Sequence, residues 1–232
     1  MLFSENYIIR KEKQLYARHR VYDKYVILEE IRLVLDNLYE KNRAEYERCK
    51  SIIKPNTWDA LEDAWKLWNP APQNTGSWGG VRNMTFTLDR RSPYFTDCLQ
   101  KHFIQCTYDE HGSPNFDKVT YPGSIVDISD LYDVMTIEQL VKRGGSRNSL
   151  QEIAQDRMSI KLENVVRAWA ERNRVTYDSY DSFYKWRDEN DLVPHEDTNC
   201  KTMRLVYRPV HKAFTHRGGI SNAKNIKNHF GL

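Results

Sequence analysis

The segment 192–219 constrains the fold more than any other part of the chain. The run 192–196 predicts a short β-strand, and the alternation of polar and apolar side chains predicts a second strand over 202–207. The turn-prone residues 197–201 between these runs predict an antiparallel hairpin. A short helix is predicted next, because Pro209 suits the first turn of a helix. The segment is therefore expected to fold as strand, turn, strand and helix.

Three of the seven histidines lie within a stretch of 22 residues inside this segment. His195 lies on the first predicted strand, whereas His211 and His216 lie on the helical part. His211 and His216 are five positions apart, which corresponds to about 140° around an ideal α-helix. Their side chains therefore converge only if the helix tightens or ends between them, which Gly218-Gly219 permits as a stop signal.

These histidines suit a metal site, because the predicted order of elements brings ligands from distant parts of the segment together. Imidazole suits Zn, Ni and Mn, and it can support Mg alongside water and phosphate oxygens. Three protein ligands leave one coordination position open for a phosphate and a water molecule, as in catalytic sites. We therefore expect His195, His211 and His216 to bind one divalent metal ion (Mg, Mn, Zn or Ni). The alternative is a chance cluster of structural histidines.

The sequence of this segment resembles a known family. The run H-E-D-T-N-C-K-T-M-R-L-V-Y-R-P-V-H-K-A-F-T-H-R-G-G, residues 195–219, is similar to the signature of HNH-type (ββα-metal) nucleases found as C-terminal toxin domains of bacterial polymorphic toxins. That signature pairs H-H or H-E with T-M-x-L-V, followed by H-x4-H and G-G. A weaker likeness extends through 151–173 and 184–188, and none is found before about Tyr121.

The resemblance implies roles for the residues that match. In the family's H-H form the first histidine binds the metal and the second is the general base. Here the second position is Glu196, so His195 is expected to bind the metal and Glu196 to act as the base. The alternative is that His195 is the base and Glu196 a ligand. Because adjacent side chains on a strand point to opposite faces, both can contribute only where the strand is irregular.

Basic side chains accumulate towards the C-terminus. The segment 200–232 contains seven Lys and Arg residues and no Asp or Glu. Such a stretch attracts polyanions, although a solvated basic face would account for the charge alone equally well. Arg204 is the candidate for stabilising the transition state of phosphodiester hydrolysis. The candidates for nucleic-acid binding are Lys201, Arg208, Lys212 and Arg217, with Arg157 and Arg187 as weaker ones upstream.

The rest of the chain predicts an α+β fold. Apolar periodicity predicts helices over 20–53, 56–68, 143–173 and 180–190. Short alternating runs predict strands over 84–88 and 102–108. The expected domains are a helical N-terminal region, a short-stranded middle part and a C-terminal ββα-metal domain, over residues 1–70, 71–121 and 122–232, with the metal site in 192–219.

Cysteine usage and hydropathy bear on the setting of the protein. Cys49, Cys98, Cys106 and Cys200 are scattered without a CxxC pair, which predicts free thiols in a reducing cytosol. The N-terminus lacks the apolar core of a signal peptide, and no segment approaches the ~20 apolar residues of a membrane span. We expect a cytoplasmic location in the producing cell, with delivery into target cells by a specialised secretion system.

The resemblance to HNH nucleases implies a divalent-metal-dependent endonuclease, and we expect a DNase of little sequence preference that acts as an antibacterial toxin. Its expected partners are DNA, or RNA in its place, and the cognate immunity protein that the resemblance implies. One alternative is a nucleic-acid-binding or interaction protein that keeps the fold but does not hydrolyse. Another is a phage or mobile-element nuclease with a helical targeting region in residues 1–120.

Overall fold

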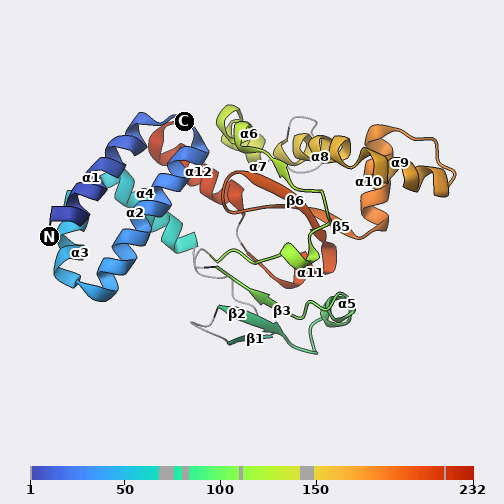
Figure 1. Ribbon diagram of the computed structural model, residues 1–232, viewed down its shortest axis with the longest axis horizontal. Helices are drawn as coiled ribbons and strands as arrows, with labels where there is room; N and C mark the ends of the chain where they lie inside the picture. Colours follow the sequence, from blue (N-terminus) through green and yellow to red (C-terminus); the bar gives the residue numbers. More distant parts are fainter. Residues whose placement is uncertain (1, 68–75, 80–83, 110–111, 142–148, 217) are drawn as a thin grey trace.

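The computed structural model describes residues 2–67, 76–79, 84–109, 112–141, 149–216 and 218–232. These residues form many helices and two three-stranded antiparallel sheets, so the predicted α+β class is confirmed. Helices α1 to α4 and α12 gather at one end of the molecule (Figure 1), and α8 to α10 lie towards the other.

The elements of the described chain have the following bounds. The helices are α1 (Leu2–Ala17), α2 (Val21–Lys41), α3 (Arg43–Ile52), α4 (Pro55–Leu67), α5 (Phe95–Gln100), α6 (Ser129–Val134), α7 (Ile137–Val141), α8 (Leu150–Lys161), α9 (Glu163–Arg172), α10 (Ser179–Glu189), α11 (Arg208–Ala213) and α12 (Gly219–Phe230), with a 3₁₀ turn η2 (Asp117–Val119). The strands are β1 (Gly76–Gly79), β2 (Thr85–Leu88), β3 (Gln105–Thr107), β4 (Val126–Asp127), β5 (Leu192–Glu196) and β6 (Thr202–Tyr207).

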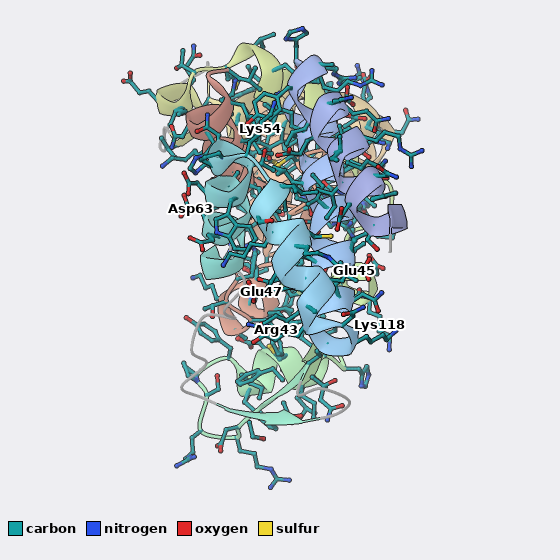
Figure 2. All side chains as sticks on the ribbon, turned by 90° about the vertical axis from the view of Figure 1, so that its left-hand side faces the viewer. Arg43, Glu45, Glu47, Lys54, Asp63 and Lys118 are labelled. Carbon is teal, nitrogen blue, oxygen red and sulfur yellow. The ribbon has the colours of Figure 1, made fainter. Side chains whose placement is uncertain are left out.

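The N-terminal region is helical, but the single helix predicted over 20–53 is two helices. The break falls at Asn42, whose side-chain oxygen accepts a hydrogen bond from the backbone N–H of Glu45 at 3.2 Å and so caps α3. Helix α1 was not predicted, although its buried Ile8 and Leu15 are seven positions apart and so lie on one face. Exposed charged side chains such as Arg43 cover the outside of these helices (Figure 2).

Two further helix predictions need correction at their ends. The region 143–173 forms α8 and α9 with a break at Leu162, and its residues up to 148 lie outside the described chain. Ser149 caps α8, since its hydroxyl accepts a hydrogen bond from the backbone N–H of Glu152 at 3.3 Å. Helix α4 begins at Pro55, one residue before its predicted start.

The C-terminal sheet has the order β4-β6-β5, and the predicted hairpin is confirmed with both strands at their expected bounds. His195 pairs with Arg204 and Glu196 with Met203 across the hairpin. Asn199 shapes the turn, because its side-chain oxygen accepts hydrogen bonds from the backbone N–H groups of Lys201 and Thr202.

Two hydrophobic cores pack against β6, one on each face of the strand. The larger core joins the N-terminal helices, α6 to α10, α12 and one face of the C-terminal sheet, including Met203 and Leu205. The smaller core joins β2, α5 and β3 to the opposite face of β6 and to α11, through Val206, Val210 and Phe214. The segment that carries the histidines is therefore held between both cores. The proposed boundaries near residues 70 and 121 stay predictions.

The four cysteines are buried free thiols, as predicted. Among the described residues, no helix combines the length and the low polarity that crossing a bilayer requires.

Candidate metal centre

The three predicted ligands come from three successive pieces of the C-terminal segment. His195 lies on β5 and His211 on the short helix α11, which has Pro209 in its first turn as predicted. His216 lies three residues beyond the last residue of α11, Ala213. The helix thus ends between the two histidines, which is the condition that their five-residue spacing imposed.

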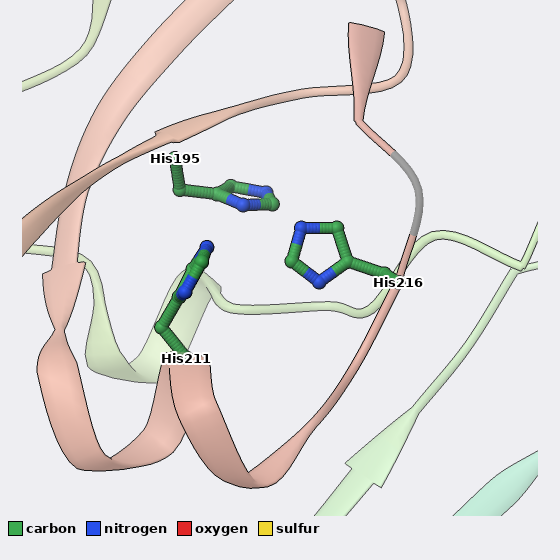
Figure 3. Close-up of side chains that lie close together, drawn as sticks. All are labelled: His195, His211 and His216. Atoms are coloured by element: carbon green, nitrogen blue, oxygen red, sulfur yellow. The ribbon is translucent and has the colours of Figure 1, made fainter. Parts of the chain in front are cut away.

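The structure brings the three imidazoles together. The ring centroids are 5.4 Å apart for His195 and His211, 4.6 Å for His195 and His216, and 5.1 Å for His211 and His216. One nitrogen of each ring lies within 4.8 Å of the other two, and the rings face a common space (Figure 3). In a tetrahedral zinc site with Zn–N bonds of about 2.0–2.1 Å, two nitrogens lie about 3.4 Å apart, so an ion would draw the three rings closer together.

Hydrogen bonding decides which nitrogen each ring can offer. The Nδ1 of His216 lies 3.2 Å from the carbonyl oxygen of Phe214, so it carries the hydrogen and Nε2 keeps a lone pair. Such an outer hydrogen bond is typical of histidines that bind metals. His195 is 2% exposed, and its Nδ1 is buried without a hydrogen-bond partner among the described residues. A bound ion would satisfy that orphaned nitrogen.

The protonation of the cluster also suits a metal. Burial lowers the pKa of His211 to about 3, and the neighbouring His216 and His195 contribute to the shift. Burial and the neighbouring His195 lower the pKa of His216 to about 4. Both imidazoles are therefore neutral at pH 7, which is the form that coordinates metal. The residues present thus fit a divalent ion bound by nitrogen, which agrees better with Zn, Ni or Mn than with Mg alone.

The loop that carries His216 is fixed by the smaller core. The ring of Phe214 is fully buried against Phe86 and Phe103. The hydroxyl of Tyr108 donates to the carbonyl oxygen of Thr215 at 3.2 Å. Residues of the middle region therefore hold the turn that aims His216 at its neighbours.

The Gly218-Gly219 pair has a different role from the predicted helix stop. Helix α11 ends before the pair, and Gly219 begins α12. A β-carbon on Gly218 would lie 2.9 Å from a carboxylate oxygen of Glu196, and one on Gly219 would meet the backbone of Asp197 and lie 2.8 Å from the hydroxyl of Tyr132. Glycine is needed here because the chain passes close against the end of β5.

The middle region also supplies an aromatic ring that contacts the whole cluster. The centroid of Phe116 lies 5.0, 6.1 and 5.7 Å from those of His195, His211 and His216. The ring is 2% exposed, so it excludes water from one side of the imidazoles. This contact could not be predicted from the sequence, since Phe116 lies far along the chain from the segment 195–219.

Glu196 follows His195 in sequence but does not belong to the group of described side chains that could hold one ion. Its carboxylate accepts a hydrogen bond from the side chain of Gln151 on α8 at 3.0 Å and also lies against Gly218. The described residues that can share an ion are the three histidines, without Glu196. This placement favours the first of the two interpretations of residues 195 and 196, in which His195 binds the metal and Glu196 is the general base.

Asp197 is the residue of the site that the sequence analysis missed. Its Oδ1 lies 3.5 Å from the Nε2 of His195. Its Oδ2 accepts hydrogen bonds from Nε and Nη2 of Arg204, at 3.1 and 2.9 Å, and from the hydroxyl of Thr202. Burial alone would raise the pKa of Asp197, but the contacts with His195, Thr202 and Arg204 outweigh it and lower the pKa. Strand alternation could have found this residue, because positions 195 and 197 share a face.

Most of the predicted basic side chains are already engaged. Arg204 pairs with Asp197 and, through Nη1 at 2.7 Å, with Asp117. Arg208 donates to Asp188 at 2.8 Å, and the ammonium of Lys201 lies 5.1 Å from the ring centroid of Tyr22.

The four other predicted basic residues differ in placement. Lys212 is exposed on α11 next to His211, whereas Arg217 lies outside the described residues. Of the weaker candidates, Arg157 pairs with Asp130 at 2.7 Å and Arg187 with Asp188 at 2.8 Å. Lys212 is thus the described candidate best placed to meet a phosphate.

A cavity of about 460 Å³ adjoins the cluster. Its walls combine residues from α2, from the loop after β3 and from the turn of the hairpin, and they include Tyr25, Asn115, Phe116, Asp197, Asn199 and Arg204. Because Phe116 and Asp197 contact the histidines directly, the cavity reaches the edge of the candidate metal centre.

No protein-family model, curated protein or solved structure matches the chain. The likeness to HNH nucleases therefore rests on the sequence of the segment 195–219 alone.

The histidine cluster predicts a pH-dependent stability of the metal-free protein. The folded-state pKa values of His211 and His216, about 3 and about 4, lie below the ordinary value of 6.5, so the unfolded chain binds more protons as the pH falls through 6.5. The free energy of unfolding should therefore decrease between pH 7 and 5, by up to about 1.4 kcal/mol per pH unit for each histidine. Urea unfolding in EDTA measures the slope. An equal slope in His211→Gln would contradict the assignment.

Proposed function

We propose that this protein is a divalent-metal-dependent endonuclease of the HNH (ββα-metal) type. The observation that carries the proposal is the convergence of His195, His211 and His216 from β5, α11 and the following turn. Their order along a strand-turn-strand-helix segment agrees with the HNH signature that the sequence resembles. The seven basic and no acidic residues of 200–232 add an attraction for a nucleic acid.

Each part of the segment has a proposed task in phosphodiester hydrolysis. When bound, the ion supplies a positive charge that polarises the scissile phosphate and stabilises the leaving oxygen. His195, His211 and His216 hold it, and three protein ligands leave room for phosphate and water. Glu196 removes a proton from the attacking water. Gln151 donates to Oε1 of Glu196 in the structure, and an ionised carboxylate has further lone pairs with which to accept the hydrogen of water.

The test is cleavage of plasmid DNA by the purified protein in Mg, Mn, Ni or Zn. We expect nicking with at least one ion, its loss on chelation, and a fall of about 10²–10⁴-fold in Glu196→Gln, the usual contribution of a general base. A matched control is Glu163→Gln, which removes an exposed carboxylate of α9 that pairs with Arg167. Plasmid that stays intact with all four ions would remove the nuclease proposal.

The biological setting is proposed on the resemblance alone. We propose that the protein acts as an antibacterial toxin, that it is delivered into target cells, and that a cognate immunity protein of acidic character restrains it. Expression without the neighbouring gene should inhibit growth, and coexpression should relieve the inhibition. Normal growth with an actively cleaving protein would reject the toxin role while leaving the nuclease activity in place.

The second candidate function is nucleic-acid binding without hydrolysis. It is favoured by the hydrogen bond between Glu196 and Gln151, because a carboxylate held by a neighbouring helix is not free to approach water. In that case DNA binding would depend on salt, would survive Glu196→Ala, and would occur without cleavage by the unmodified protein.

A further inference from the structure

We propose that Asp197 is a positioning residue of the metal centre. By accepting the Nε2–H of His195, it makes this histidine present Nδ1 to the ion, whereas His216 presents Nε2. The inference rests on the proposed metal site and adds to it a residue that lies outside the three ligands.

The argument begins with the two nitrogens of His195. A neutral imidazole has one N–H group and one lone pair, and a carboxylate can only accept a hydrogen bond. The Nε2 of His195 lies 3.5 Å from Oδ1 of Asp197, whereas its Nδ1 is buried without a partner among the described residues. The hydrogen therefore belongs on Nε2, and the lone pair on Nδ1 is left for the ion.

The other hydrogen bonds of Asp197 leave its Oδ1 to accept the Nε2–H of His195. The hydroxyl of Thr202 and the Nε and Nη2 groups of Arg204 all donate to Oδ2. Oδ1 is thus left facing His195. Arg204 is held in turn by Asp117 at 2.7 Å, so the carboxylate is fixed by a chain of contacts that reaches the middle region.

Asp197 is not itself placed as a ligand. The described group of side chains that can share an ion is made of the three histidines. Asp197 follows β5, and its backbone N–H continues the ladder by donating to the carbonyl oxygen of Thr202 at 2.9 Å. It therefore lies on the same face as His195 and behind the ring, in the arrangement of a carboxylate-histidine-metal triad.

The first test is the tautomer of each histidine in the zinc-loaded protein. Long-range ¹H–¹⁵N spectra of ¹⁵N-labelled protein identify which ring nitrogen carries the hydrogen and which binds zinc. We expect zinc on Nδ1 of His195 with hydrogen on Nε2, and the reverse for His216. Zinc on Nε2 of His195 would overturn the positioning role while leaving the metal site in place.

The second test is zinc affinity in Asp197→Asn, a nearly isosteric change. Because three donors face Oδ2, the new amide should turn its oxygen towards Arg204 and its NH₂ group towards His195. That group favours hydrogen on Nδ1, so affinity should fall by about 10–100-fold. The matched control Asp130→Asn removes an exposed carboxylate of α6 that pairs with Arg157, and it should change affinity by less than about threefold.

The outcomes separate the two proposals. If the unmodified protein binds zinc at the three histidines but Asp197→Asn binds it equally well, the positioning role is wrong and the metal site stands. If the unmodified protein binds no zinc there, both the metal site and the positioning role fall. Should Asp197→Asn not fold, the tautomer of His195 in the unmodified protein still decides.

Discussion

The His211→Ala variant is expected to lose both metal binding and DNA cleavage. His211 is one of the three proposed ligands, and its ring centroid lies 5.4 and 5.1 Å from those of His195 and His216. Loss of an outer-shell partner already costs about 10–100-fold in metal affinity, so loss of a ligand should cost more than about 100-fold. Isothermal titration with zinc and a plasmid-nicking assay measure the two effects.

Thermal unfolding gives an independent measure of the same variant. Zinc at about 100 times its Kd should stabilise the unmodified protein by about 2.7 kcal/mol, which raises the Tm of a chain of this size by about 5–10 °C. The rise should disappear in His211→Ala. The control is His19→Ala, since His19 is exposed between α1 and α2. Equal shifts in His211→Ala and the unmodified protein would mean that zinc binds elsewhere.

The second large effect is expected for Phe214→Ala. The ring of Phe214 is fully buried and packs edge-on against Phe86 and Phe103, with centroids 6.0 and 5.5 Å away. Removing a buried phenylalanine ring typically costs about 3–5 kcal/mol. Because the carbonyl oxygen of Phe214 also accepts the Nδ1–H of His216, zinc affinity should fall together with stability.

Urea unfolding measures the stability change, and the control is a neighbouring exposed position. Lys212→Ala removes an exposed side chain of α11, the helix that ends just before Phe214, and should change the free energy of unfolding by less than about 0.5 kcal/mol. A Phe214→Ala protein as stable as the unmodified one would show that the middle region does not hold the turn that carries His216.

Local signals explain which parts of the fold could be predicted. The hairpin was predicted at both ends, because alternation along two short runs and the turn chemistry of Asn199 all act within a few residues. Helix α12 was missed because a pair of glycines looked like the end of a structure. Its buried Ala223 and Ile226 nevertheless follow Gly219 at helical spacing. The two glycines are required because the backbone passes close to the end of β5, and this contact depends on the tertiary structure.

The sequence predicted only those features of the site that depend on residues close together along the chain. Three histidines on a strand-turn-strand-helix segment indicated a set of metal ligands. The spacing of His211 and His216 required the helix to end between them, and α11 does end there, at Ala213. Asp197 was predictable from strand alternation. The contact of Phe116 with the three rings and the pairing of Asp117 with Arg204 were not, since nothing in their own sequence neighbourhood points to the segment they contact.

The most direct measurement is anomalous diffraction from crystals grown with zinc or soaked in manganese. The metal-centre proposal predicts one peak at about 2.0–2.1 Å, for zinc, from a nitrogen of each of His195, His211 and His216. Imidazoles that remain without an ion while peaks occur elsewhere, or rings turned outwards into solvent, would contradict it.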